Sequence, residues 1–92
     1  MALQFEISDS LQHFLDKLTK RDHALAISVR KKIDQIIECD LVSIQHFKNL
    51  KHDLSHLKRV QIGPFVLVFQ VKAGTVIFED FDHHDRIYKK KF

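Results

Sequence analysis

The sequence predicts an α+β fold with the order β-α-α-β-β-β, in which a mainly antiparallel four-stranded sheet carries a helix pair on one face. Three observations indicate this fold. A short alternating pattern of apolar and polar residues opens the chain, and two apolar stripes of helical period follow it. Three strand-like segments come last, separated by a Gly-Pro and an Ala-Gly pair. With 92 residues and no internal repeat or linker, the chain fits a single domain, 1–92.

The N-terminal half predicts one strand and two helices. Residues 3–7 alternate between apolar and polar side chains, which is typical of a strand. A Ser-Asp-Ser segment suited to helix N-caps follows, and apolar residues then recur with helical spacing over 11–18. Asp22 is positioned to cap a second, longer helix over 25–37. The basic residues of that helix fall on the face opposite its apolar stripe, as expected of a solvated face.

The C-terminal half predicts a loop and three strands in a meander. The segment QHFKNLKHDLSHL is mostly polar and is interpreted as a loop that leads into a strand over 56–62. Residues 65–71 are almost all apolar, which favours a central strand covered on at least one face. The Ala-Gly pair suits a tight turn into a third strand over 75–81, and the C-terminal tail follows that strand directly.

The charge is spread unevenly along the chain. The formal net charge is +3, with six Lys/Arg against seven Asp/Glu in residues 1–45 and nine against five in residues 46–92. A basic C-terminal half suggests an anionic partner, either nucleic acid or an acidic protein. Lysines that serve only solubility are the alternative explanation.

Several classes of protein are excluded by the sequence. No apolar run approaches the ~20 residues that a membrane-spanning helix needs. The N-terminus lacks the basic start and long apolar stretch of a signal peptide. Cys39 is the single cysteine, so an internal disulfide is impossible. We therefore expect a cytoplasmic protein without a membrane contact.

A metal site or cofactor is not expected. His83 and His84 are adjacent, so on a strand their side chains point to opposite faces. His52 and His56 would share a face only if their segment were helical, and Cys39 has no CxxC partner. Two glycines at separate turns do not make a phosphate-binding loop.

The basic half is suited to phosphodiester cleavage without a metal. Cutting RNA through its own 2′-OH requires a base, a cation that stabilises the charged phosphorane, and an acid for the leaving oxygen. Histidine suits proton transfer near neutral pH, Lys and Arg bind phosphate, and tyrosine stacks on a base. If the meander forms, Arg59 and the histidine pair could converge on one sheet face. The alternative is an exposed polar sheet surface without catalytic function. The candidate residues are Lys48, Lys51, His52, His56, Arg59, His83, His84, Arg86, Tyr88 and Lys89.

The stretch FKNLKHDLSHLKRVQIGPFVLVFQV, followed by FEDFDHHDRIYKK, resembles the RelE/ParE superfamily of toxins from bacterial and archaeal toxin–antitoxin pairs. The likeness lies in a lysine-leucine loop, a strand with arginine, a glycine turn and a closing histidine pair with Ile-Tyr. It spans roughly residues 3–90. For RelE-like members it implies a metal-independent endoribonuclease that cuts mRNA in the ribosomal A site and is inhibited by an antitoxin. For ParE-like members it implies an inhibitor of DNA gyrase.

The resemblance also implies roles for individual residues. Lys48 would hold the phosphate together with Arg59. Lys51 or His84 would act as the base. His83 or Tyr88 would act as the acid or stack on a base. The expected site therefore comprises the catalytic residues Lys51, Arg59, His83, His84 and Tyr88 and the RNA-binding residues Lys48, Arg86 and Lys89.

Two positions depart from the family pattern. Val66 stands where many RelE-like toxins have an arginine after the glycine turn, and His84 stands where the closing pair usually has its arginine. The leading hypothesis is the toxin of a type II toxin–antitoxin system that cuts mRNA on the ribosome and is bound by a small, acidic, helical antitoxin. The alternatives are a ParE-like gyrase inhibitor and a catalytically inactive toxin-fold protein that acts by protein binding.

Overall fold

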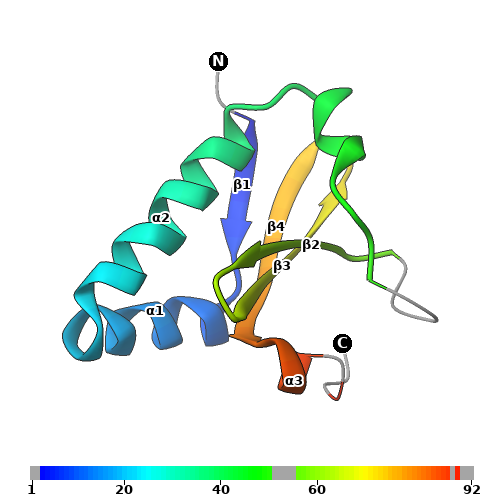
Figure 1. Cartoon of the computed structure of the whole chain (residues 1–92). Helices are drawn as coiled ribbons and strands as arrows, with labels where there is room; N and C mark the ends of the chain where they lie inside the picture. The colour runs from blue at the N-terminus through cyan, green and yellow to red at the C-terminus, as the bar shows by residue number, and fades with distance from the viewer. Residues whose placement is uncertain (1–2, 51–55, 88, 90–92) are drawn as a thin grey trace.

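A computed structural model describes residues 3–50, 56–87 and 89. The helices and strands follow one another in the predicted order, with two short helices added (Figure 1). They are β1 (Gln4–Ile7), α1 (Asp9–Arg21), α2 (His23–Ile37), the 3-10 helix η1 (Ser43–His46), β2 (Lys58–Ile62), β3 (Phe65–Lys72), β4 (Thr75–His83) and α3 (His84–Ile87).

The four strands form one sheet with the order β1-β4-β3-β2. β2, β3 and β4 are antiparallel, as the meander predicts, whereas β1 pairs in parallel with β4. The register shifts between Val68 and Phe69, which places Glu79 as an extra residue in β4. The predicted α+β class, with a mainly antiparallel sheet, is therefore confirmed.

α1 and α2 lie together on one face of the sheet, where they enclose the main core (Figure 1). Their apolar stripes pack against alternate residues of the strands, because side chains two apart on a strand share a face. Phe78 is fully buried at the centre, with its ring centroid 5.9 Å from that of Phe69 and 6.2 Å from that of Phe5. The buried members of this main core are Leu11, Leu15, Val29, Ile33, Ile36, Ile37, Ile44, Leu67, Phe69, Val76, Phe78 and Phe81.

Both helices begin at predicted N-caps. The Ser8 hydroxyl accepts a hydrogen bond from the backbone N–H of Leu11 at 3.2 Å and donates one to the carbonyl of Glu79 at 2.8 Å. The Asp22 carboxylate accepts from the backbone N–H of Leu25 at 3.1 Å. Ser8 therefore starts α1 and also ties that helix to β4.

Replacing Ser8 by alanine is expected to lower the free energy of unfolding by about 1–2 kcal/mol, because an N-cap is lost together with a second hydrogen bond. Urea unfolding followed by circular dichroism measures the loss. Ser28→Ala is the matched control, since Ser28 is exposed within α2 and its hydroxyl donates to the carbonyl of Ala24 in the same helix. An equal loss in both variants contradicts the capping role of Ser8.

A second, smaller apolar cluster lies on the sheet face that α1 and α2 leave open. Val66 and Val68 of β3 form its floor. Leu50, Leu57 and Ile87 of α3 pack with these two valines and are themselves buried. We call this surface the open face; its cluster contains Leu50, Leu57, Val66, Val68 and Ile87.

The sequence did not predict η1 or α3, which lie in segments interpreted as a loop and a tail. η1 is stabilised by Asp40, whose carboxylate accepts a hydrogen bond from the backbone N–H of Ser43 at 2.7 Å. That hydrogen bond holds the pKa of Asp40 below its usual range. α3 is only four residues long and is joined to the β2–β3 turn by the His84 N–H, which donates to the Pro64 carbonyl at 2.9 Å.

None of the helices in the described ranges is both long enough and apolar enough to cross a bilayer.

Candidate functional site

Arg59 lies on the open face of the sheet. Its neighbours on β2, Val60 and Ile62, pack against the main core, so the alternation of the strand turns Arg59 to the opposite side. There it stands opposite Val68 in the β2–β3 register, next to the apolar cluster of the open face. The strand pattern thus positions a guanidinium group against an apolar floor.

The Nε atom of Arg59 is buried and has no hydrogen-bond partner among the residues that the structure describes. A buried donor left without an acceptor costs about 1–3 kcal/mol. Such a group is tolerated where a ligand supplies the acceptor, and a guanidinium forms paired hydrogen bonds with phosphate oxygens. Arg59 is therefore suited to bind an anion on the open face.

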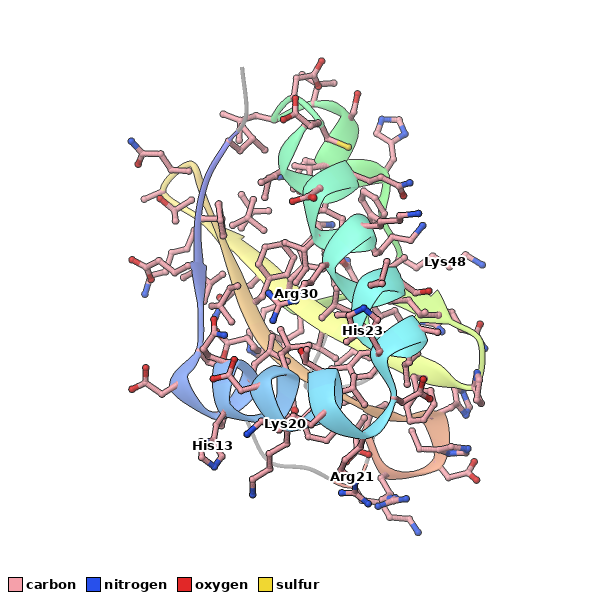
Figure 2. All side chains as sticks on the ribbon, turned by 90° about the vertical axis from the view of Figure 1, so that its left-hand side faces the viewer. His13, Lys20, Arg21, His23, Arg30 and Lys48 are labelled. Carbon is pink, nitrogen blue, oxygen red and sulfur yellow. The ribbon has the colours of Figure 1, made fainter. Side chains whose placement is uncertain are left out.

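Lys48 lies directly beside Arg59. The backbone N–H of Arg59 donates to the Lys48 carbonyl at 2.8 Å, and the N–H of Leu50 donates to the Leu57 carbonyl at 2.9 Å. Residues 48–50 thus continue the sheet along the outer edge of β2. The Lys48 side chain is exposed and projects away from α2 into solvent (Figure 2). The structure therefore brings together the two cations that were predicted to hold phosphate.

Lys58 is a residue that the sequence analysis missed. It is only 8% exposed, yet its ammonium donates to the Gln45 carbonyl at 3.2 Å, the Phe47 carbonyl at 3.4 Å and Asn49 Oδ1 at 3.0 Å. Three acceptors match the three donors of a lysine. Lys58 consequently fastens the segment that carries Lys48 to the edge of the sheet. No sequence signal separates this lysine from its exposed neighbours.

Lys58→Met is expected to lower the free energy of unfolding by about 1–3 kcal/mol, because the apolar side chain leaves buried acceptors unsatisfied. Amide hydrogen exchange should also accelerate at Leu50 and Arg59, whose backbone hydrogen bonds join this segment to β2. Lys72→Met, at an exposed position of β3, is the control and should change neither measurement. Unchanged exchange in Lys58→Met contradicts the fastening role.

His83 ends β4 on the side of the two long helices. It stands opposite Phe65 in the register, and the two rings make an edge-on contact at 5.8 Å between centroids. Phe65 in turn stacks on Phe81 of the main core at 5.2 Å. The expectation that Arg59 and both histidines converge on one face is therefore wrong for His83, because its position in the register points its side chain away from Arg59.

The hydrogen bonds around His83 determine its neutral tautomer. The backbone N–H of Asp85 donates to His83 Nδ1 at 3.1 Å, so Nδ1 acts as an acceptor and the proton lies on Nε2. The Asp85 carboxylate also lies 3.6 Å from His83 Nδ1 and 3.7 Å from His84 Nδ1. The two imidazoles and this carboxylate therefore lie close together where β4 passes into α3.

His84 begins α3 at the turn that joins β2 to β3, and its side chain is 50% exposed. Arg59 lies three residues before the end of β2, or about 10 Å along the strand from this turn. Arg59 and His84 therefore lie at opposite ends of the β2–β3 hairpin.

Arg86 does not lie with Arg59 and Lys48 on the open face. Its Nε lies 3.9 Å from Asp82 Oδ1, and the residue lines a cleft beside α1 and α2 rather than the open face. Lys89 is exposed, and its N–H donates to the Arg86 carbonyl at 3.0 Å. Lys51 and Tyr88, two predicted catalytic residues, lie outside the described residues.

Val66 is fully buried in the cluster of the open face. The position that many RelE-like toxins give to arginine is therefore apolar floor here, and it supplies no charge to a bound anion. Within residues 3–50, 56–87 and 89, no three His, Cys, Asp or Glu side chains are grouped so that they could hold a metal ion.

Comparison with known proteins gives two sequence relatives along nearly the whole chain. "Putative toxin RelE4" of Methanocaldococcus jannaschii is 48% identical over 91 residues, which cover 96% of this chain and 93% of the relative. An uncharacterized protein of Methanosarcina mazei is 38% identical over 86 residues, which cover 90% of this chain and 95% of that protein. A search of protein-family models gave no match.

Solved structures share the fold at low sequence identity. YafQ of E. coli superposes with a TM-score of 0.71 at 12% identity, covering 94% of this chain and 98% of YafQ. A chain of the RelBE2 toxin–antitoxin complex of Mycobacterium tuberculosis gives 0.66 at 19% identity, covering 91% of this chain and all of that one. HP0894 of Helicobacter pylori gives 0.61 at 23% identity, covering 90% and 96%. With a relative 48% identical along almost its full length, the chain belongs to the RelE family of toxins from toxin–antitoxin pairs.

Proposed function

We propose that the protein is a metal-independent, ribosome-dependent mRNA endonuclease whose RNA-binding surface is the open face around Arg59. The observation that carries this proposal is the buried Nε donor of Arg59, which lacks an acceptor among the described residues. Arg59 as a whole is only partly buried, so an RNA phosphate would pair with the accessible part of its guanidinium and neutralise the charge. Lys48, exposed beside Arg59, adds attraction for the same backbone.

In this proposal the reaction proceeds through the 2′-OH of the RNA. Arg59 stabilises the negative charge that develops on the phosphorus centre as the 2′-oxygen attacks. Lys51 or His84 removes the 2′-OH proton, and His83 or Tyr88 either protonates the leaving 5′-oxygen or stacks on the target base. The His83 side chain lies on the opposite face of the sheet from Arg59, which favours Tyr88 over His83 for the acid role.

The proposal includes an antitoxin and a cellular location. The mycobacterial structure that shares this fold is a toxin–antitoxin complex. We propose that a small, acidic, helical antitoxin binds this chain too, and that the chain acts in the cytoplasm as a single domain over residues 1–92. Its net charge of +3 favours an acidic partner.

Primer extension on a defined mRNA in a translating extract tests the proposed function. The wild-type protein should produce cuts at codon boundaries of the translated region, and ribosome-depleted extract should show none. Cuts that persist without ribosomes contradict the ribosome dependence. A wild-type protein that arrests growth but makes no cuts contradicts the endonuclease assignment altogether.

One observation favours a second candidate, a ParE-like gyrase inhibitor or an inactive toxin-fold protein that acts by protein binding. The centre of the open face is apolar, with Val66 fully buried where a phosphate-binding arginine would be expected. A site without this arginine has one phosphate-binding cation fewer. A gyrase supercoiling assay distinguishes the candidates, because inhibition of supercoiling without mRNA cuts favours the second.

A further inference from the structure

The cleft that Arg86 lines has a volume of about 400 Å³ and lies on the opposite side of the sheet from the open face. It opens between the end of α1, the start of α2 and the junction of β4 with α3. We call it the helix-side cleft. Its lining combines aromatic and aliphatic side chains with three cations and two carboxylates: Phe14, Lys17, Leu18, Arg21, Asp22, Leu25, Phe65, Asp82 and Arg86.

The apolar part of the helix-side cleft presents aromatic rings. Phe14 is 39% exposed, although its ring centroid lies 6.0 Å from that of Phe81 in the main core. Phe65 is held flat on Phe81, with an angle of 18° between the ring planes. The two leucines of the lining are partly buried against the main core. Both rings therefore pack against Phe81 of the main core, and the exposed part of Phe14 is accessible to a ligand.

The charged part of the cleft has three cations, of which Arg86 lies 3.9 Å from Asp82. Arg21 projects from the end of α1 near α3 (Figure 2), and Lys17 precedes it by one helical turn. Arg86 approaches from α3 and is 73% exposed. The two carboxylates take part in backbone hydrogen bonds, since Asp22 caps α2 and Asp82 accepts from the N–H of His83 at 2.7 Å.

We propose that the helix-side cleft is a second binding site for single-stranded RNA. An unpaired base would pack against Phe14 and Phe65, and its flanking phosphates would be held by Arg21, Arg86 and Lys17. Aromatic faces combined with a positively charged groove are the general means of binding single strands without reading their sequence. The site is separate from Arg59, so it does not depend on the proposed cleavage reaction.

Two features favour RNA over an acidic peptide as the occupant. The well-exposed apolar group is a phenylalanine ring, which stacks on any base, whereas the aliphatic groups that would hold a peptide side chain are mostly covered. Two of the three cations are arginines, whose planar forks bind phosphate oxygens in pairs. The exposed aromatic ring and the two arginines of the lining thus favour RNA as the ligand of the helix-side cleft.

Fluorescence anisotropy with a 5′-fluorescein decauridylate tests this site in the full-length protein. The triple variant Lys17→Gln, Arg21→Gln, Arg86→Gln should weaken binding at least tenfold and lower the salt slope of log K by about 2. The matched control is Arg30→Gln, Lys31→Gln, Lys32→Gln, which removes equal charge from α2 outside the cleft. It should change the affinity less than twofold.

Phe14→Leu keeps the apolar volume of the side chain but removes its ring, and it should weaken RNA binding about fivefold, since stacking on an aromatic ring contributes ~1–3 kcal/mol per base. Equal losses in the triple variant and its control contradict the site. So does undiminished binding in Phe14→Leu, or tight cleft-dependent binding of a Glu/Leu peptide in place of RNA. If the triple variant binds RNA normally while wild-type cuts persist on the ribosome, the cleft proposal fails and the proposed function stands.

Discussion

Arg59→Gln is expected to reduce mRNA cleavage on the ribosome by about 10²–10³-fold, because removing a group that stabilises transition-state charge has an effect of that size. Glutamine keeps a polar side chain but cannot offer the paired, charged donors of a guanidinium. Single-turnover cleavage of a programmed ribosome measures the rate, and the loss should appear in the rate constant at saturating protein. The large effect follows because Val66 supplies no second charge near this position.

Gln61→Ala is the matched control, since Gln61 is the next residue of β2 on the same face and is exposed. It should retain cleavage within about twofold. Arg59→Lys should recover part of the rate by restoring the charge without the planar fork. If Arg59→Gln cuts as fast as the wild type, Arg59 has no catalytic role and its buried Nε must be explained by folding alone.

Phe78→Ala is expected to lower the free energy of unfolding by about 3–5 kcal/mol, a large part of the ~5–15 kcal/mol that stabilises a typical domain. Phe78 is fully buried and contacts the rings of Phe69 and Phe5, so its removal leaves a cavity in the main core. Chemical denaturation at 25 °C measures the loss. Partial unfolding in buffer would itself agree with the expectation.

Ile27→Ala serves as the comparison for this stability experiment, because Ile27 is a large apolar residue of α2 that is 40% exposed. Ile27→Ala should lower the free energy of unfolding by less than about 1 kcal/mol. A Phe78→Ala protein as stable as Ile27→Ala would show that the centre of the main core lies elsewhere.

The regular parts of the fold could be predicted because local and long-range preferences agree there. The helical stripes of 11–18 and 25–37 became the buried faces of α1 and α2, and Asp22 caps α2 as its position suggested. The apolar run of 65–71 became β3, whose side chains contribute to the clusters on both faces of the sheet. The sequence predicted cover on at least one face of this strand, and the structure covers both.

The short elements could not be predicted because tertiary contacts create them. α3 has four residues, too few for a helical period, and it is fixed by the hydrogen bond from His84 to Pro64 and by the burial of Ile87. The parallel pairing of β1 with β4 likewise depends on where two segments 71 residues apart meet. Neither the helix α3 nor the parallel pairing of β1 with β4 is indicated by a local pattern in the sequence.

The candidate site was predicted in part. Arg59 and Lys48 are adjacent as expected, because both lie on paired segments at one end of β2. The expected convergence of His83 with Arg59 was wrong, since the bulge near Glu79 changes which residues at the end of β4 face the main core. No face was predicted for Arg86, which lines the helix-side cleft. Lys58 was missed because burial of a lysine is decided by its acceptors.

Replacement of a single 2′-OH by hydrogen tests the central claim most directly. An mRNA is prepared with a 2′-deoxy nucleotide on the 5′ side of the phosphate that the wild-type protein cuts, and cleavage on the ribosome is followed by primer extension. We predict that the cut disappears at the modified site and persists at unmodified sites. A cut that survives at the 2′-deoxy nucleotide would contradict attack by the RNA's own hydroxyl, and with it the assigned role of Arg59 in that reaction.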